Sequence, residues 1–376
     1  MKAGKPVDQK GGKIYYEYYN HWMRKLSQAE EQYYGLCNFN PRKEMGMSRT
    51  LDNRIVHLYE YGGLLLVVGR VLRRLVSPMR FLMSPVLFAK LEMLLRLGYW
   101  PDLKHPESFN EKICCRKLFA PHPLSTVVTD KYAVREYIVA RTGRLDLLNN
   151  LYFCGINPEK IPFDDLPEKF VIKATHGSGW TIVVSDKNRV ERDEIIEQCR
   201  VWPGEKYSEA SKNYSEKHYD LIEPRIIVEK FIEDPTFNLP LDYKFFCFHG
   251  KVFCIRVVIR SMDLVHFKEI HYDANWEEMN FRWEAPRAQS FPRPKLLQEM
   301  IVVSEQISRE FDFCRVDLYC PDDKKVIFGE VTLTPESGLS PFIPREWDYR
   351  FGEKWQWSPA SRGQEQTTFG TPEADE

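Results

Sequence analysis

The residues whose types and spacing suggest chemistry lie near the C-terminus, in two short segments joined by a Pro-Asp-Asp turn. Arg315–Tyr319 alternates in character, and Val326–Leu333 is β-branched and apolar with interruptions, so the two segments should pair as a β-hairpin. Pairing would place Asp317 beside Glu330 and Thr332, which are two apart and therefore share one strand face. Carboxylate and hydroxyl oxygens on neighbouring strands suit a hard cation, and Mg²⁺ in particular keeps room for substrate phosphates.

The alternative is a solvated hairpin that carries ordinary surface carboxylates. Glu330 argues against it, because this residue interrupts an apolar run instead of lying at a turn. A carboxylate in such a place needs a cationic partner or a metal ion. The residue types therefore leave two alternatives, a metal site and a plain hairpin, with Glu330 favouring the metal.

A second candidate is a small-residue loop between two apolar segments. Lys173 lies near the end of the first segment, and His176, Gly177, Ser178 and Gly179 follow it. Glycines let backbone N–H groups approach an anion closely and the lysine adds positive charge, so the loop suits a phosphate. Gly-Ser-Gly also occurs in ordinary hairpins, and His176 suits either a phosphate contact or a structural role. The spacing is not Gly-x-x-x-x-Gly-Lys-Ser/Thr, which disfavours a P-loop NTPase.

Basic side chains also mark a β-hairpin predicted over residues 242–260, which turns at His-Gly-Lys. Lys244 lies on a largely apolar strand face, where a charge is costly unless it has a partner. Arg256 and Arg260 are four apart in a strand and share a face, so they suit a phosphate or an acidic acceptor. The alternative is a pair of surface arginines on an edge strand.

Together these motifs resemble a known enzyme family. Arg315-Val-Asp-Leu-Tyr, followed by Gly329-Glu-Val-Thr-Leu-Thr-Pro-Glu-Ser-Gly, resembles the C-terminal signature of ATP-grasp enzymes. In that signature an Asp on one strand and a Glu-x-Asn on the next bind Mg²⁺ under the ATP phosphates, and Thr332 stands here where Asn is usual. The version with Thr, and the Pro-Phe-Ile-Pro-Arg-Glu-Trp-Asp tail from Pro341, is similar to the TupA-like ATP-grasp family, named for teichuronopeptide biosynthesis. The resemblance extends back to about Pro106.

The resemblance implies an α+β ATP-grasp fold, in which two α+β lobes hold ATP and Mg²⁺ between them. The metal ligands that it implies are Asp317, Glu330 and Thr332. The implied phosphate contacts are Lys131, Lys173, Lys244 and the loop of His176, Gly177, Ser178 and Gly179. The implied adenine contacts are Glu229, Lys230 and Ile232, with Glu233 for the ribose and Asp234 or Asp242 as alternatives. The catalytic candidates are Lys244, Arg256 and Arg260.

Composition disfavours several broad classes of protein. The 53 basic and 54 acidic residues leave a formal net charge of −1, which gives no global reason to expect nucleic-acid binding. The nine cysteines are scattered and odd in number, without a Cys-x-x-Cys pair, so neither a disulfide framework nor a zinc site is expected. Reduced thiols fit a cytoplasmic location, and the N-terminus has no signal-peptide pattern.

The 376 residues are too many for one small core, so several domains are expected. A helical extension is predicted over 1–98, with an amphipathic helix at Ile14–Gln32 and an apolar, basic stretch at Leu58–Gly98. Charges interrupt this stretch too often for a bilayer span, which needs about 20 apolar residues. It suits either helices lying on the inner face of an anionic membrane or core helices whose arginines face water. The remaining segments are predicted to be a pre-ATP-grasp region (99–165), a small lid lobe (166–228), a metal and ATP lobe (229–357) and a disordered tail (358–376).

The chemistry implied by the resemblance is ligation of a carboxylate to an amine through an acyl phosphate. The family's association with surface polysaccharides implies a carboxylate-bearing saccharide, such as a uronic acid, and an amine as the second substrate. A kinase on the same fold would instead transfer phosphate to a hydroxyl. A glycosyltransferase of the same pathway would need an Asp-x-Asp type metal motif, which is not found in a convincing strand-end setting. A non-catalytic nucleotide-binding protein is the last alternative, because Thr332 replaces the usual Asn.

Overall fold

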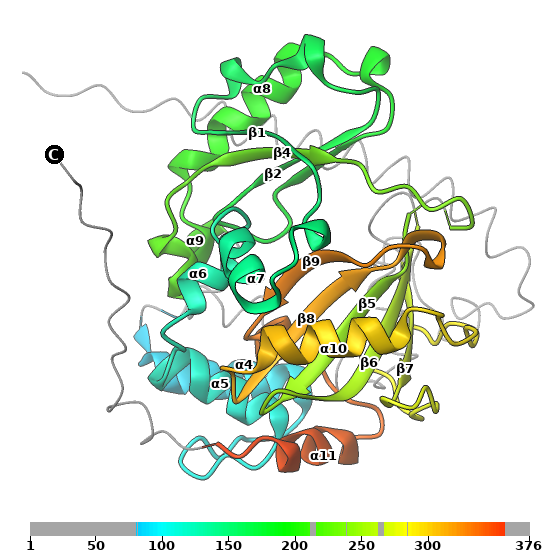
Figure 1. Ribbon diagram of the computed structural model, residues 1–376. Helices are drawn as coiled ribbons and strands as arrows, with labels where there is room; N and C mark the ends of the chain where they lie inside the picture. The colour runs from blue at the N-terminus through cyan, green and yellow to red at the C-terminus, as the bar shows by residue number, and fades with distance from the viewer. Residues whose placement is uncertain are drawn as a thin grey trace, which may run out of the picture. The chain divides into compact units, whose positions relative to one another are not determined.

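The computed structural model of this chain describes residue 80 and residues 82–210, 216–237, 239–261, 267–283 and 285–357 (Figure 1). All described residues belong to one compact unit. The helix predicted over Ile14–Gln32, the basic stretch before residue 80 and the tail at 358–376 lie outside the described residues. Within the described part, no helix combines the length and the apolar character that a membrane crossing requires.

Four antiparallel strands form a small sheet in the order β1-β4-β2-β3. Their bounds are Leu151–Gly155 for β1, Phe170–Ala174 for β2, Thr181–Val184 for β3 and Ile226–Lys230 for β4. Helix α8 (Arg192–Val201) lies above this sheet in Figure 1, and its apolar side packs with the buried positions of β2 and β4. Strand β1 comes from the segment that the sequence assigns to the pre-ATP-grasp region, so the small sheet draws on both sides of that predicted boundary.

Five antiparallel strands form a larger sheet in the order β7-β6-β5-β8-β9. Their bounds are Asp242–Phe248 for β5, Lys251–Arg260 for β6, Phe267–Tyr272 for β7, Phe313–Tyr319 for β8 and Ile327–Thr332 for β9. Helix α10 (Leu297–Ser308) runs along this sheet in Figure 1 and buries its apolar side chains against it. The pairing of β8 with β9 confirms the hairpin predicted around the metal-ligand candidates.

Strand alternation gives the larger sheet an apolar face beneath α10 and an opposite face, called the polar face here, which carries ionisable side chains next to the buried aromatic residues Phe246, Phe248 and Phe313. On β5, Tyr243, Phe245 and Cys247 belong to the core beneath α10, whereas Asp242 and Lys244 belong to the opposite face. Residues directly paired across an antiparallel ladder share a face. One line of such pairs crosses all five strands and consists of His271, Arg256, Lys244, Asp317 and Glu330. Five ionisable side chains therefore stand in a row on one surface of the sheet, while its other surface is apolar.

The described residues form six further α-helices. Their bounds are Pro85–Leu97 (α4), Phe109–Phe119 (α5), Ser125–Thr129 (α6), Val134–Thr142 (α7), Tyr207–Ala210 (α9) and Glu346–Lys354 (α11). A capping box begins α5, because the Glu111 N–H donates to Ser108 Oγ (3.2 Å) and the Ser108 N–H donates to Glu111 Oε2 (3.0 Å). Helix α7 packs against α10 through Tyr137 and Ile138, so it belongs to the core of the larger sheet.

Helix α11 meets the start of α5 at Gly352, where two backbones approach closely. A Cβ atom at this position would lie 2.0 Å from the Glu107 carbonyl oxygen, so an alanine requires a backbone shift. We expect Gly352→Ala to lower the free energy of unfolding by about 2–3 kcal/mol, as overpacking of a core does. Urea denaturation followed by circular dichroism measures the change. The matched control is Gly204→Ala, because a Cβ there has open space around it, and an equal loss in both variants would contradict the prediction.

Candidate active site

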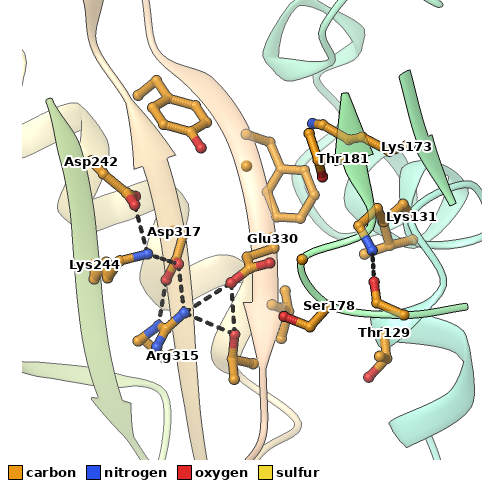
Figure 2. Close-up of a pocket in the computed structure, with 18 of the residues that line it drawn as sticks. Thr129, Lys131, Lys173, Ser178, Thr181, Asp242, Lys244, Arg315, Asp317 and Glu330 are labelled. Atoms are coloured by element: carbon orange, nitrogen blue, oxygen red, sulfur yellow. Dashed lines mark hydrogen bonds and ion pairs between the residues drawn. The ribbon is translucent and has the colours of Figure 1, made fainter. Parts of the chain in front are cut away.

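A cavity of about 800 Å³ lies between the small sheet and the polar face of the larger sheet. The small sheet contributes Lys173 on β2 and Thr181 on β3 to its wall, and the larger sheet contributes Lys244, Asp317 and Glu330 (Figure 2). The turn between α6 and α7 adds further side chains. The wall therefore requires both sheets, which bring together residues far apart in the sequence.

Most of the site residues predicted from the sequence lie in the cavity wall. They are Lys131, Lys173, Gly177, Ser178, Gly179, Glu229, Lys230, Ile232, Lys244, Arg256, Arg260, Asp317, Glu330 and Thr332. His176 and Glu233 are not among the wall residues. Of the two alternatives to Glu233, Asp242 lies in the wall, whereas Asp234 accepts hydrogen bonds from the backbone N–H groups of the turn that follows it.

His176 and Glu233 have partners elsewhere. His176 is buried, with Nε2 2.8 Å from the Trp202 carbonyl oxygen, and burial lowers the pKa of its ring. This arrangement corresponds to the structural alternative that the sequence leaves open for the histidine. Glu233 Oε2 lies 3.1 Å from Lys169 Nζ in an exposed ion pair, outside the cavity.

The predicted metal ligands converge on one point. Asp317 on β8 pairs directly with Glu330 on β9, and Thr332 follows two residues later. Arg315 Nη2 lies 2.7 Å from Asp317 Oδ2, 2.8 Å from Glu330 Oε1 and 3.1 Å from Thr332 Oγ1, contacts that are drawn in Figure 2. One cationic nitrogen within reach of all three oxygens shows that this donor set can surround a cation.

These ligand types suit Mg²⁺. Proteins usually bind Mg²⁺ through one or two carboxylates and leave the remaining positions to water and phosphate oxygens. Asp317 and Glu330 supply two carboxylates, and Thr332 supplies a hydroxyl that also donates to Glu330 Oε1 (3.2 Å). Among the residues that the structure describes, no group of three or more His, Cys, Asp and Glu side chains is placed to hold a metal ion. The site therefore fits an ion that completes its shell with oxygens from a substrate.

Lys244 is compensated by two carboxylates on the polar face of the larger sheet. Its Nζ lies 2.7 Å from Asp242 Oδ2 and also contacts Asp317 Oδ2. Burial by itself raises the pKa of Asp317, but the positive charges of Arg315 and Lys244 outweigh burial and lower that pKa to about 2. Asp317 is therefore ionised at neutral pH.

Lys131 and the glycine loop form the opposite wall of the cavity. Lys131 Nζ donates to the Gly177 carbonyl oxygen, and burial lowers the pKa of this lysine to about 8. Two positions in the loop require glycine. Gly179 has φ +79°, and a Cβ atom at Gly177 would lie 2.6 Å from the Trp180 ring. The small residues predicted to receive a phosphate thus keep the loop backbone close to Lys131.

Lys173 belongs to a chain of ion pairs that links the two sheets. Lys173 Nζ lies 2.9 Å from Glu229 Oε2, and Glu229 Oε1 lies 3.3 Å from Arg135 Nη1. Arg135 also donates through Nη2 to the Asn149 carbonyl oxygen (2.9 Å). Arg135 is on α7, a helix that packs against the core of the larger sheet. Glu229 and Lys173 are on the small sheet. Glu229 therefore connects Lys173 of the small sheet with Arg135 of α7.

Sequence reasoning assigned no role to two of these cations, Arg315 and Arg135. Arg315 carried a usable signal, because a residue two positions before Asp317 in a strand has to share its face. Arg135 carried none, since its partner Glu229 is 94 residues away and reaches it only through the packing of α7 beside the small sheet.

The chain resembles known proteins in sequence and in fold. The TupA-like ATPgrasp family model matches residues 111–356. No curated protein matches the chain.

Several solved structures are similar in fold at low identity. D-alanine–D-alanine ligase from Bacillus anthracis, complexed with ATP, is 15% identical over 61% of this chain and 65% of its own, with a TM-score of 0.35. N5-carboxyaminoimidazole synthase from Aspergillus clavatus is 11% identical over 55% of this chain and 44% of its own, with a TM-score of 0.32. VanG D-Ala:D-Ser ligase from Enterococcus faecalis is 10% identical over 55% of this chain and 52% of its own, with a TM-score of 0.31. The chain spans less than two thirds of the length of each of these structures.

The family match covers well over half of the chain and includes both sheets from β1 to β9. It confirms the predicted α+β ATP-grasp fold, whose two lobes correspond to the small and the larger sheet. The chain belongs to the TupA-like ATP-grasp family.

Proposed function

We propose that the protein is an ATP- and Mg²⁺-dependent ligase that joins a carboxylate to an amine through an acyl phosphate. The observation that carries this proposal is one cavity in which a carboxylate pair and several basic side chains meet between the two sheets. The basic side chains are Lys131, Lys173, Lys244 and Arg315. The reaction needs no protein nucleophile, because the acceptor carboxylate and the amine are themselves the nucleophiles.

In the first step a carboxylate oxygen of the acceptor attacks the γ-phosphorus of ATP, and the bond to the β–γ bridging oxygen breaks to release ADP. In the second step the amine attacks the acyl carbonyl, loses a proton and expels inorganic phosphate. Asp317, Glu330 and Thr332 would hold Mg²⁺, which when bound neutralises phosphate charge. Lys131 and Lys173 would offset the remaining negative charge as the phosphoryl group moves.

The proposed acceptor is a carboxylate-bearing saccharide, such as a uronic acid of a bacterial surface polysaccharide, as the family resemblance implies. Two arginines of β6 are candidates for binding it. Arg256 Nη2 lies 2.7 Å from Glu269 Oε2, and both side chains are buried, so Arg256 already has a carboxylate partner. Arg260 is 34% exposed and lies 3.8 Å from Asp242 Oδ2, which leaves it better placed to meet an acceptor carboxylate.

The decisive experiment is a turnover assay with Mg-ATP, a panel of uronic acids and a panel of amino acids. ADP, inorganic phosphate and the amide product are quantified in the same reactions. Ligation predicts equal amounts of all three and dependence on both partners. Phosphorylated acceptor and ADP without free phosphate would identify a kinase, and ATP binding without ADP formation across the panels would contradict the proposed ligase.

The lowered pKa of Lys131 predicts pH-dependent nucleotide binding. Below its pKa of about 8 the lysine is cationic and attracts phosphate, and above that value it loses the charge. We expect ADP affinity to be constant from about pH 6 to 7.5 and to fall by up to about tenfold per unit above pH 8. Calorimetric titrations in buffers of different ionisation enthalpy should also detect proton uptake on binding above pH 8. Lys131→Arg keeps its charge over this range, so a fall of the same size in that variant would contradict the assignment.

The ion-pair chain predicts an effect of Arg135 on nucleotide binding. Replacing it by glutamine leaves the full charge of Glu229 on Lys173, so the lysine is less available to a phosphate. We expect Arg135→Gln to raise the KM for ATP about tenfold with a smaller change in kcat. The matched control is Arg141→Gln on the same helix, because Arg141 pairs with Glu310 (2.6 Å) away from the cavity. Equal KM values for both variants would show that the chain does not position Lys173.

A further inference from the structure

Arg315 lies where the predicted metal ligands converge. Its Nη2 contacts one oxygen each of Asp317, Glu330 and Thr332, and its Nε lies 2.7 Å from Asp317 Oδ1. The guanidinium is thus held by both oxygens of one carboxylate and by one oxygen of the other (Figure 2). The side chain is only 6% exposed, so these carboxylates are its immediate surroundings.

A divalent cation and Arg315 require the same oxygens. A Mg²⁺ ion held by these oxygens of Asp317 and Glu330 would need the space that Arg315 Nη2 occupies between them. The guanidinium keeps its positive charge at all ordinary pH values, so it repels a metal ion as well as blocking it. The Arg315 side chain therefore has to move away before a divalent metal ion can bind these ligands.

The local charge balance favours Arg315 when no further anion is present. The carboxylates of Asp242, Asp317 and Glu330 face the cations Lys244 and Arg315, and Arg260 lies 3.8 Å from Asp242, which leaves the cluster neutral. A divalent cation that enters alone makes this cluster positive. A nucleotide brings several negative charges, which can accept the displaced guanidinium and the metal ion together.

We propose that Arg315 is a resident counter-ion of the metal ligands and makes divalent metal binding depend on nucleotide. The proposal rests on the proposed function, because it takes the ATP phosphates to be the anion that draws Arg315 away from the carboxylates. Metal ion and nucleotide then bind together, and the free enzyme does not hold the metal ion at Asp317 and Glu330 by itself.

The test measures Mn²⁺ binding to the full-length protein without nucleotide, by electron paramagnetic resonance of free Mn²⁺. Arg315→Met removes the charge and keeps an unbranched side chain, and we expect it to bind Mn²⁺ at least tenfold more tightly than the wild type. Arg315→Lys keeps a charge that cannot contact all three oxygens at once, so its gain should be smaller. The double variant Arg315→Met with Asp317→Asn should lose this gain in Mn²⁺ affinity. That loss would show that the added Mn²⁺ affinity depends on the Asp317 carboxylate.

Arg141→Met is the control for a general loss of positive charge, because Arg141 pairs with Glu310 (2.6 Å) away from the cavity. Its Mn²⁺ affinity should change less than threefold. Equal affinities for wild type, Arg315→Met and Arg315→Lys would overturn the proposal, as would tight Mn²⁺ binding by the wild type without nucleotide. If Arg315→Met does not fold, as judged by circular dichroism, Arg315→Gln takes its place in the same comparison.

A parallel titration with ADP separates this proposal from the proposed function. In the wild type, ADP should raise the affinity of the protein for Mn²⁺ at least tenfold, whereas in Arg315→Met the increase should be smaller. Failure of the wild type to bind ADP at all would count against the proposed function. ADP binding with the same metal–nucleotide coupling in both proteins would overturn the role of Arg315 alone.

Discussion

Asp317→Asn should lower ATP turnover by at least about 10³-fold, because it removes a charge from the proposed ligands of the metal ion. Asparagine has nearly the same size, but it neutralises the one carboxylate that both Arg315 and Lys244 contact. The pKa of Asp317 in the wild type is about 2, so its carboxylate is ionised and available to a cation at neutral pH. Steady-state ADP formation at saturating ATP and Mg²⁺ measures the effect.

The control for this substitution is Glu277→Gln, which neutralises an exposed carboxylate outside the cavity wall. Its turnover should stay within about twofold of the wild type, since exposed carboxylates away from a site contribute little. Thermal unfolding of both variants separates a loss of chemistry from a loss of structure. If Asp317→Asn turned over at the wild-type rate, the proposed metal site would be wrong.

Lys244→Met should lower both turnover and stability. Turnover should fall about 10²–10³-fold, because the proposed reaction then lacks one of the positive charges that offset the phosphate charge. The free energy of unfolding should fall by about 3 kcal/mol, since Asp242 and Asp317 then lie buried with one cation fewer. Urea denaturation and ADP formation measure the two losses on the same preparation.

The double variant Asp242→Asn with Lys244→Met distinguishes the two effects. Neutralising Asp242 removes one of the carboxylates that Lys244 compensates, so part of the stability should return. Turnover should remain low, because the missing ammonium is not replaced. A double variant as unstable as Lys244→Met would show that charge compensation is not what Lys244 contributes to stability, and recovered turnover would remove Lys244 from the proposed chemistry.

Local patterns were sufficient to place the metal-ligand candidates and Lys244 on their strand faces. The period of two in β8 and β9, with the polar turn between them, placed Asp317, Glu330 and Thr332 on one face. The same alternation placed Lys244 on a strand face with Phe246 and Phe248, and the cost of a charge on that face correctly indicated a buried partner. Such predictions succeed because side-chain direction in a strand follows from the backbone alone.

Partners across long sequence distances were not predictable in this way. Arg256 looked like a free arginine beside a substrate, but β7 brings Glu269 against it and buries both. His176 is part of the predicted phosphate loop in the sequence, but its ring nitrogen Nε2 is hydrogen-bonded to the carbonyl oxygen of Trp202, directly after α8. In both cases the partner is set by how elements pack, and a strand or loop pattern contains no information about that packing.

The sequence by itself determined the family, the β8–β9 hairpin and the residue types that face the cavity, because these follow from motif spacing and strand periodicity. Only the tertiary structure decided which charges pair. Arg135 pairs with Glu229 because α7 packs beside the small sheet. Arg315 pairs with Asp317 and Glu330 because of the conformation of its side chain. The physical reason is that ion pairs act over a few ångströms, and only the folded chain sets distances on that scale.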